Sequence, residues 1–459
     1  MSLARQVATV VARTTWDDVP APVLDRARHL VLDAVGLAFA ASAHPFADTA
    51  AQALGSFGPG DVPVLGSKTR LPARDAAVLN GVLVHGLDFD DTHIGAVTHV
   101  SASALPAAIS AAVAADATTR DLLLGYVLGV EVAARVGLAG AGAFHDLGFH
   151  PTALAGAFGS AVAAGKVTGL AEDQLVAAQG VVGSMAAGLL EFLEDGSWTK
   201  RLHPGWAAQS GITAAAFARA GWSGPEAVYE GRFGLFATHL AGRETHPELV
   251  AAGLGERWET AETAVKPYPI CHFAHAFADA VLLLREQHDL RSEDVAAIRC
   301  AIHPVPGKVV CEPAAAKWEP RDEYDAKFSL PYVVSTALAR GRFTLAELED
   351  DALRDPEVLA LARKVEVVPD PDSAFPAAYS GWVQITTTDG RVLTHREQVN
   401  RGHADRPLTD DDVVTKFRGS MAPVADEATT ERVLAAVLSL GREATDTSAR
   451  TFAEACAAG

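Results

Sequence analysis

A long succession of apolar segments with helical spacing is the feature that most limits how this chain can fold. These segments run from about residue 22 to residue 220, and strand-like alternation is scarce among them. Ala and Gly supply much of the apolar content, and such small side chains allow helices to approach closely. The first half therefore predicts a compact helical core. The expected helices cover residues 23–41 after Pro22, 74–85, 101–115, 119–136, 151–167, 172–192 and 205–220.

The pattern changes near Val265, where short β-branched segments bounded by proline appear. Residues 295–305 and 364–371 are typical of strands, and residues 382–399 predict a hairpin around Asp389-Gly390. Helices are expected at 274–287 and 330–339, and helical spacing returns after Thr409, including 427–440. We therefore predict a mainly α protein with a smaller α+β domain. A large all-helical domain would comprise residues 1–262 and 405–459, and an α+β lid domain residues 263–404.

Composition and charge narrow the classes of function. The chain has 459 residues and a formal net charge of -19, which disfavours nucleic acid as a partner. An anionic substrate would need its own local cluster of Lys, Arg and His. The four cysteines form no CxxC pair, which indicates a reducing compartment and no iron–sulfur cluster. We found no signal peptide and no run of about 18 consecutive apolar residues, so we expect a cytoplasmic protein without a membrane partner.

The densest polar segment is residues 80–99, NGVLVHGLDFDDTHIGAVTH, in which carboxylates follow the expected end of a helix near Gly86. An ordinary solvated loop would explain such a run, but the flanking helices are apolar. Asp and His in alternation also suggest a divalent metal. A metal-dependent phosphohydrolase built on His145-Asp146 and the carboxylates at 88–93 therefore stays an alternative.

Three further segments concentrate groups that suit a polycarboxylate. His150 directly precedes Pro151 at a helix N-terminus, where free N–H groups favour an anion and lower the pKa of a histidine. The other two segments place cationic groups close to a helix start. The alternatives without a functional role are a helix-capping histidine at His150 and, for the cationic segments, exposed loops with salt bridges. The candidate groups of these two segments are Lys200, Arg201 and His203, then Lys266, His272 and His275.

Taken together, these segments resemble the MmgE/PrpD family. The matching stretches occur in the family's order over about residues 75–335. The resemblance implies a helical domain with a smaller α+β lid, usually as a homodimer, and activities such as 2-methylcitrate dehydratase, cis-aconitate decarboxylase and iminodisuccinate epimerase. The motifs are HGLDFDDTH with His99 downstream, GFHPTALAGAFGSA, DGSWTKRLHPGWAAQSG, KPYPICHFAH and DAKFSLPYVV, with RGHADRPLTDDDVVTKFRG near the C-terminus.

The resemblance also implies roles for individual residues. The active-site residues of the family's decarboxylase branch correspond, by this resemblance, to Asp88, Thr92, His99, His150, Lys200, His275 and Tyr332. We expect Asp88, His99, His150, Lys200 and His275 to be catalytic, and Thr92, Arg201, His203, Lys266, His272 and Tyr332 to bind substrate, with no metal and no cofactor. Whether His272 or His275 faces the site, and which histidine is the acid, stays open. The chain lacks the Asn and Trp typical of the 2-methylcitrate dehydratase branch near DFDDTH, which disfavours that substrate.

The three activities share one chemical problem. Each passes through a carbanion-like state beside a carboxylate, which needs cations near the carboxylate oxygens and a placed acid or base. We therefore expect a lyase that dehydrates or decarboxylates a small di- or tricarboxylate. The nearest alternative is an epimerase or isomerase of a dicarboxylate such as iminodisuccinate. A catalytically idle helical scaffold fits less well, because the polar residues cluster at helix ends.

Overall fold

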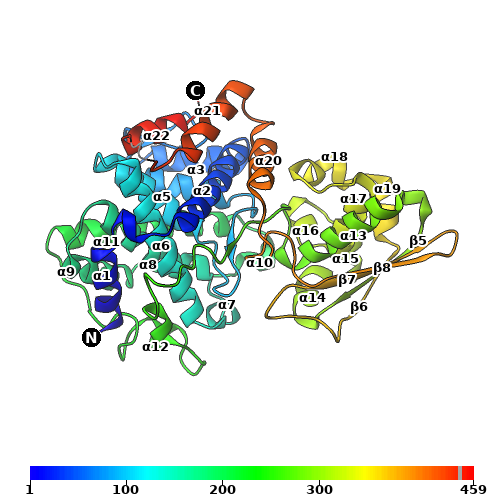
Figure 1. The fold of residues 1–459 in the computed structure, drawn as a ribbon, viewed down its shortest axis with the longest axis horizontal. Helices are drawn as coiled ribbons and strands as arrows, with labels where there is room; N and C mark the ends of the chain where they lie inside the picture. The colour runs from blue at the N-terminus through cyan, green and yellow to red at the C-terminus, as the bar shows by residue number, and fades with distance from the viewer. Residues whose placement is uncertain (443–446, 459) are drawn as a thin grey trace. The chain divides into compact units, whose positions relative to one another are not determined.

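The computed structural model describes residues 1–442 and 447–458 and divides into two compact units. Unit 1 comprises residues 1–265 and 409–459, and unit 2 comprises residues 266–408 (Figure 1). Residues 443–446 and 459, which belong to the predicted helical domain, lie outside the described residues. Unit 1 is helical apart from short two-residue strands, and unit 2 combines helices with one four-stranded sheet. The predicted fold class, mainly α with a smaller α+β part, is confirmed.

Unit 1 is built around the apolar helix α8, Pro151–Val167, in which every residue except Lys166 is buried. Small residues permit this burial, because Gly159 lies so close to the carbonyl of Gly129 on α6 that a side chain there would clash. The helices of unit 1 are α1 (Leu3–Arg13), α2 (Ala21–Ser42), α3 (Pro45–Gly55), α4 (Ala73–His85), α5 (Ser101–Ala114), α6 (Thr119–Ala139), α7 (Ala143–Asp146), α8, α9 (Glu172–Val182), α10 (Phe192–Asp195), α11 (Thr199–Arg219), α12 (Leu235–His239), α20 (Asp410–Met421), α21 (Glu427–Leu438) and α22 (Ala449–Ala455).

Two predicted helix boundaries were wrong. The helix expected over 172–192 ends at Val182, because Gly183 caps it and Gly188 has a φ of 149° that other residues rarely adopt. The helix expected to start at Gly205 begins at Thr199 and continues through Pro204. Proline disfavours a helix interior, which misplaced the predicted start. Lys200, Arg201 and His203 therefore lie within the first turns of α11 and not ahead of it.

Helix α6 is the helix of unit 1 that bears on the expectation about membrane-spanning segments. It is long and apolar enough to cross a membrane by length and composition, although charged residues interrupt its apolar run. Within the most apolar 18-residue stretch of α6, 94% is buried inside the protein. The core helix of a soluble protein has the same length, composition and burial.

Unit 2 contains a four-stranded sheet in the order β6-β5-β7-β8. Strand β5 (Val295–Ile302) pairs in parallel with β6 (Val365–Pro369) and antiparallel with β7 (Gly381–Thr387), which pairs antiparallel with β8 (Val392–Glu397). Gly390, with a φ of 89°, lies in the turn between β7 and β8. The predicted hairpin and both predicted strands are confirmed.

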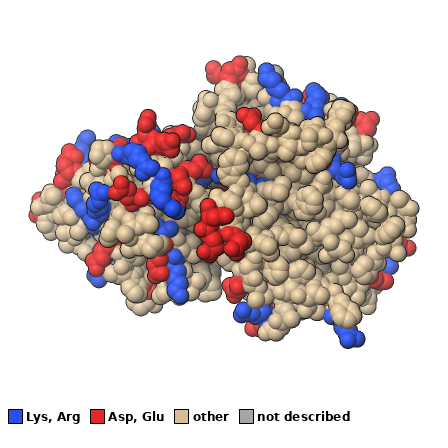
Figure 2. Space-filling view, turned by 180° about the vertical axis from the view of Figure 1, so that it is seen from behind, with Lys and Arg blue, Asp and Glu red and all other residues tan. Residues whose placement is uncertain are grey.

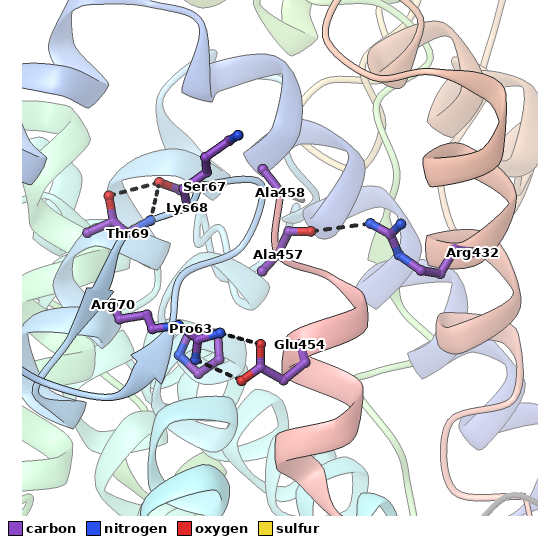
Figure 3. A pocket seen from close by; sticks show the side chains of 9 residues that line it. All are labelled: Pro63, Ser67, Lys68, Thr69, Arg70, Arg432, Glu454, Ala457 and Ala458. Atoms are coloured by element: carbon purple, nitrogen blue, oxygen red, sulfur yellow. Dashed lines mark hydrogen bonds and ion pairs between the residues drawn. The ribbon is translucent and has the colours of Figure 1, made fainter.

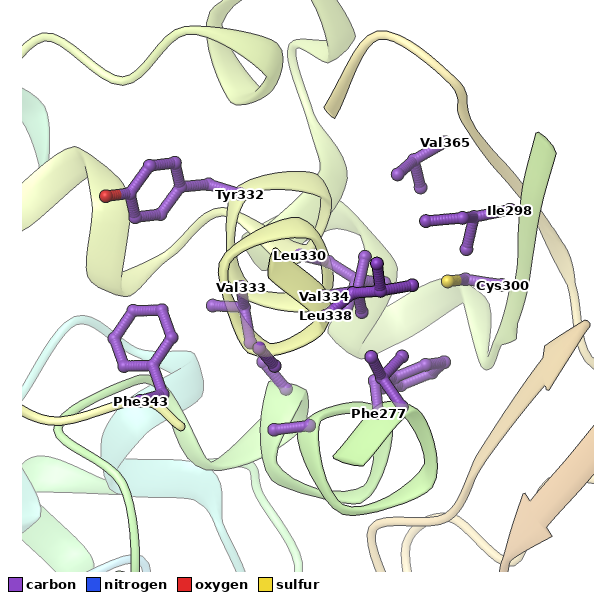
Figure 4. Close-up of a cluster of buried hydrophobic side chains, with 14 of the residues drawn as sticks. Phe277, Ile298, Cys300, Leu330, Tyr332, Val333, Val334, Leu338, Phe343 and Val365 are labelled. Atoms are coloured by element: carbon purple, nitrogen blue, oxygen red, sulfur yellow. The ribbon is translucent and has the colours of Figure 1, made fainter. Parts of the chain in front are cut away.

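One face of this sheet is covered by helices. Burial alternates along β7, and the inward side chains of Val383 and Ile385 join a core that includes Phe277 of α13 (His275–His288) and Val334 of α17 (Leu330–Arg340) (Figure 4). This core holds unit 2 together independently of unit 1. The other helices of unit 2 are α14 (Pro304–Cys311), α15 (Ala314–Trp318), α16 (Glu323–Lys327), α18 (Asp350–Leu353) and α19 (Pro356–Ala362).

Candidate active site

Asp88 lies in the loop that follows helix α4. Its φ of 54° falls in the left-handed region, which Asp adopts more readily than most residues, and its N–H donates to the carbonyl of His85. This turn places Oδ2 of Asp88 2.8 Å from Nζ of Lys200 on α11. Oδ1 of the same carboxylate is 3.8 Å from Nε2 of His99. Asp88 thus lies between a cation and an imidazole.

Asp90 joins two imidazoles in the interior of unit 1. Its Oδ2 is 2.9 Å from Nδ1 of His85, the last residue of α4, and its Oδ1 is 3.3 Å from Nδ1 of His99. Burial alone would raise the pKa of Asp90, but the two imidazoles outweigh burial and hold this pKa well below its usual range. Burial lowers the pKa of His85. Asp90 is therefore an anion that hydrogen-bonds the ring of His85 and lies at ion-pair distance from the ring of His99.

His150 and His203 form a second imidazole pair beside the first. His150 is the N-cap residue of α8, and its Nδ1 lies 3.0 Å from Nδ1 of His203 on α11. The ring centroids of His150 and His85 are 5.7 Å apart. Burial, then the neighbouring cationic groups, lower the pKa of His150 well below its usual value and that of His203 to about 4. Both rings are therefore neutral near pH 7, and one donates to the other.

His99 is held by threonines as well as carboxylates. Its main-chain N–H donates to Oγ1 of Thr152 on α8, at 3.1 Å, and its Nδ1 lies 3.5 Å from Oγ1 of Thr92. Thr92 belongs to strand β3 (Thr92–His93), which pairs with β4 (Thr263–Ala264). The adjacent His93 is 3.1 Å from the carboxylate of Glu259. The loop that carries His99 is thus fixed at both ends.

Arg201 serves the packing of unit 1. Its Nε donates to the carbonyl of Gly86 at 2.8 Å, and its guanidinium lies 4.5 Å from the centre of the Phe46 ring. This contact links the start of α11 to the end of α4. Its predicted role in binding substrate stays a prediction.

The other four predicted residues belong to unit 2. Lys266 is 3% exposed, and the hydroxyl of the fully buried Tyr332 donates to the carbonyl of Glu347. His272 and His275 have ring centroids 4.6 Å apart. Nε2 of His272 is 3.2 Å from the Asn400 amide nitrogen, and Nε2 of His275 donates to the carbonyl of Ile270. Their participation in one site with the cluster of unit 1 stays a prediction.

Comparison with protein families covers almost the whole chain. The MmgE/PrpD N-terminal domain matches residues 5–248, which contain the cluster of His99, His150 and Lys200, and the MmgE/PrpD C-terminal domain matches residues 268–441. The chain belongs to the MmgE/PrpD family. The predicted resemblance is thereby confirmed.

Relatives of this MmgE/PrpD protein include enzymes named cis-aconitate decarboxylase. The chain is 30% identical to a cis-aconitate decarboxylase of Aspergillus terreus over 93% of its own length and 90% of the relative's. It is 29% identical to a human cis-aconitate decarboxylase over 96% of its length and 92% of the relative's. A cis-aconitate decarboxylase-like protein of Aspergillus oryzae is 29% identical over 92% and 91% of the two chains.

A hollow of about 330 Å³ lies elsewhere on unit 1 of this family member (Figure 3). Its lining contains no histidine and none of the predicted site residues, and its one carboxylate, Glu454, is held by both terminal nitrogens of Arg70. It therefore lacks the imidazoles that lie around Asp88 and Asp90. The lining residues are Pro63, Ser67, Lys68, Thr69, Arg70, Arg432, Glu454, Ala457 and Ala458.

One group of side chains has the composition of a metal site. His85, Asp88, Asp90 and His99 offer ligand atoms that all lie within 4.8 Å of one another. The ammonium of Lys200 already pairs with Asp88, so a cation is present at this carboxylate without a metal. His145 and Asp146 of the phosphohydrolase alternative are exposed on α7 and do not belong to this group.

Exhaustive chelation is expected to leave the activity of this MmgE/PrpD protein unchanged. Lys200 places a positive charge at Asp88, and in the mechanism expected from the sequence imidazoles would transfer the protons, so no step would need a metal ion. The check is turnover after dialysis against a strong chelator, with metal analysis of the same sample. A stoichiometric metal whose loss and return track activity would contradict this expectation and revive the phosphohydrolase.

Proposed function

We propose that this chain is a lyase that decarboxylates cis-aconitate or a closely related small tricarboxylate. The observation that carries the proposal is the likeness, over nine-tenths of both chains, to relatives named cis-aconitate decarboxylase. The cluster of unit 1 supports it, because a cation, carboxylates and imidazoles lie together in a protein of net charge -19. A polycarboxylate would find local positive charge there that the molecule as a whole does not offer.

The reaction requires one carbon–carbon bond to break and one carbon–hydrogen bond to form. The bond to a carboxylate breaks, carbon dioxide leaves, and the electron pair remains on the substrate. In an unsaturated tricarboxylate this pair spreads through the double bond to the carbon beside another carboxylate. A proton delivered to that carbon completes an unsaturated dicarboxylate. The protein must stabilise the transient negative charge and supply the proton.

The side chains of unit 1 match these two tasks. The ammonium of Lys200 would stabilise charge on the substrate's carboxylate oxygens, with Asp88 holding it in place at 2.8 Å. His99 would deliver the proton from Nε2, since its Nδ1 faces Asp90. His150 and His203, neutral because burial lowers their pKa values, would hydrogen-bond the substrate without charging the site further. Neutral rings avoid repulsion with Lys200.

The proposal is tested by incubating the purified protein with cis-aconitate, citrate and other citrate-like acids. Ultraviolet absorbance and proton NMR would follow each acid. Turnover of cis-aconitate with release of carbon dioxide supports the proposal. Hydration or dehydration without carbon dioxide would instead assign a dehydratase. Racemisation of a dicarboxylate without a change in absorbance would assign the epimerase. No reaction with any tricarboxylate would overturn the proposed substrate class.

We also propose that the enzyme works as a homodimer in the cytoplasm, without a cofactor. Large apolar side chains are exposed on unit 1, including Trp198, Trp206 and Trp222 at 48%, 48% and 62%. Figure 2 shows a broad face of unit 1 with few charged side chains. Such surfaces are typical of protein interfaces. Sedimentation equilibrium at micromolar concentration would show twice the chain mass of 47.9 kDa, and a monomer would contradict the dimer.

A further inference from the structure

We propose that Asp90 and His85 are positioning residues for His99, with Asp90 fixing the ring so that Nδ1 carries the hydrogen and Nε2 exchanges the proton. The proposal rests on the function proposed above, which makes His99 the proton donor. Neither Asp90 nor His85 was among the residues predicted from the sequence.

The distances around Asp90 define one arrangement of hydrogens. Its two oxygens face two different imidazole Nδ1 atoms, at 2.9 Å for His85 and 3.3 Å for His99. An ionised carboxylate accepts hydrogen bonds and donates none, so Nδ1 of His85 must carry the hydrogen of its bond to Asp90. Nδ1 of His99 lies at ion-pair distance from Oδ1, and a hydrogen on that nitrogen is the arrangement that the negative charge favours. The rings of His85 and His99 meet edge to face, with centroids 4.7 Å apart and planes at 64°. One carboxylate therefore fixes the tautomer of His85 and favours the matching tautomer of His99.

Burial makes this arrangement costly to alter. Asp90 and His85 are each 1% exposed, so water cannot replace a lost partner easily. Nε2 of His85 has no hydrogen-bond partner among the described residues. The ring of His85 thus has its one polar contact at Asp90 and anchors the carboxylate through Oδ2, the oxygen that does not face His99. Nε2 of His99 is left beside Asp88, at 3.8 Å, where proton transfer is needed.

The main chain next to Asp90 is also fixed. Nζ of Lys416 on α20 donates to the carbonyl of Phe89 at 2.9 Å and pairs with the buried Asp33 at 2.6 Å. The main chain from which the Asp90 side chain extends is therefore held in place, as are the partners of its carboxylate. A purely structural role for Asp90 would explain why this residue is buried. It would not explain why Asp90 faces His99, the imidazole that lies beside the Asp88–Lys200 pair.

The experiment compares Asp90→Asn and His85→Gln with the control Asp91→Asn. An Asn amide can turn its N–H₂ toward Nδ1 of His99 and select the wrong tautomer. We expect Asp90→Asn to lower kcat by about 10²-fold or more with KM within about twofold, as when a carboxylate that fixes a catalytic histidine is removed. His85→Gln should lower kcat less. Asp91 is buried, accepts from Ser101, and has its pKa raised by burial to about 7, so its neutral amide should leave His99 unchanged.

The tautomer is read without substrate, by ¹⁵N NMR of histidine-labelled protein, with His99 assigned from its own variant. We expect Nδ1–H on His99 in the wild type and in Asp91→Asn, whether or not Nε2 also carries the proton that it delivers, and a ring with Nε2–H and bare Nδ1 in Asp90→Asn. A His99 ring with Nε2–H and bare Nδ1 in the wild type would overturn the proposal even if Asp90→Asn fails to fold. So would an unchanged tautomer and kcat in a folded Asp90→Asn, or a metal ion bound by the four side chains. A wild type without lyase activity but with the expected tautomer would remove the proposed function alone.

Discussion

His99→Ala and Lys200→Ala are each expected to lower kcat/KM by about 10²–10⁴-fold, the usual effect of removing a positioned acid or a partner of developing negative charge. The imidazole of His99 lies 3.8 Å from Asp88 and 3.3 Å from Asp90, and the ammonium of Lys200 lies 2.8 Å from Asp88. Loss of Lys200 also leaves the Asp88 carboxylate, which is only 8% exposed, without its cation. Steady-state kinetics with the substrate found by the screen would measure both effects.

His145→Ala is the matched control for these substitutions. This histidine is exposed on α7 and would be essential only in the phosphohydrolase alternative. We expect its kcat/KM to stay within about threefold of wild type, as for a surface substitution away from the site. Near-wild-type turnover in both His99→Ala and Lys200→Ala would mean that the active site has been misplaced. A large loss in His145→Ala would favour the alternative.

Gly205→Ala is expected to lower the free energy of unfolding by about 3 kcal/mol, the upper end of the usual cost of overpacking, or to prevent folding. A Cβ at Gly205 of α11 would lie 2.2 Å from the carbonyl oxygen of Val78 on α4, and main-chain atoms cannot move aside as a flexible side chain can. A Cβ at Gly81 on α4 would in turn lie 2.4 Å from the Cα of Gly205. This close crossing brings the end of α4, with His85, toward the start of α11, with Lys200. Chemical denaturation would measure the loss, and kinetics would show a weakened site.

Gly419→Ala on α20 provides the control for the same chemical change. A Cβ there would meet nothing within 4 Å, so the better helix propensity of Ala should leave stability unchanged or raise it by up to about 1 kcal/mol. Equal midpoints of unfolding for Gly205→Ala and wild type would contradict the close contact between α4 and α11.

Much of the fold follows from patterns that act over short distances. The apolar spacing of residues 151–167 predicts α8 to the residue, and Asp389-Gly390 predicts the hairpin of unit 2. The predicted start of α11 was wrong because tertiary packing overrides the local tendency of proline to end a helix. Pro204 stands inside α11, and the main-chain contact at Gly205 shows that tertiary packing holds this part of the helix in place.

The segments that form the candidate site could be predicted from the sequence, but the side-chain pairs within it could not. The density of carboxylates and histidines in residues 80–99 marks the segment, yet it does not say which carboxylate faces which ring. The sequence predicts Asp88 as a catalytic residue without indicating its partner, whereas the structure pairs Asp88 with Lys200 and places Asp90 closer to His99. His85 and Thr152 were missed because each reads as an ordinary helix residue. The left-handed turn at Asp88, which sets these directions, leaves no pattern in one sequence.

Turnover in deuterated water tests the central claim most directly. If the lyase forms a carbanion beside a carboxylate and protonates it from an imidazole that exchanges with solvent, the new carbon–hydrogen bond must carry solvent hydrogen. NMR of the product from cis-aconitate is expected to show one deuterium, at the carbon that receives the proton after carbon dioxide leaves. His99→Ala should slow this incorporation together with product formation. Complete conversion to product without any deuterium would contradict the proposed carbanion and its protonation by the enzyme.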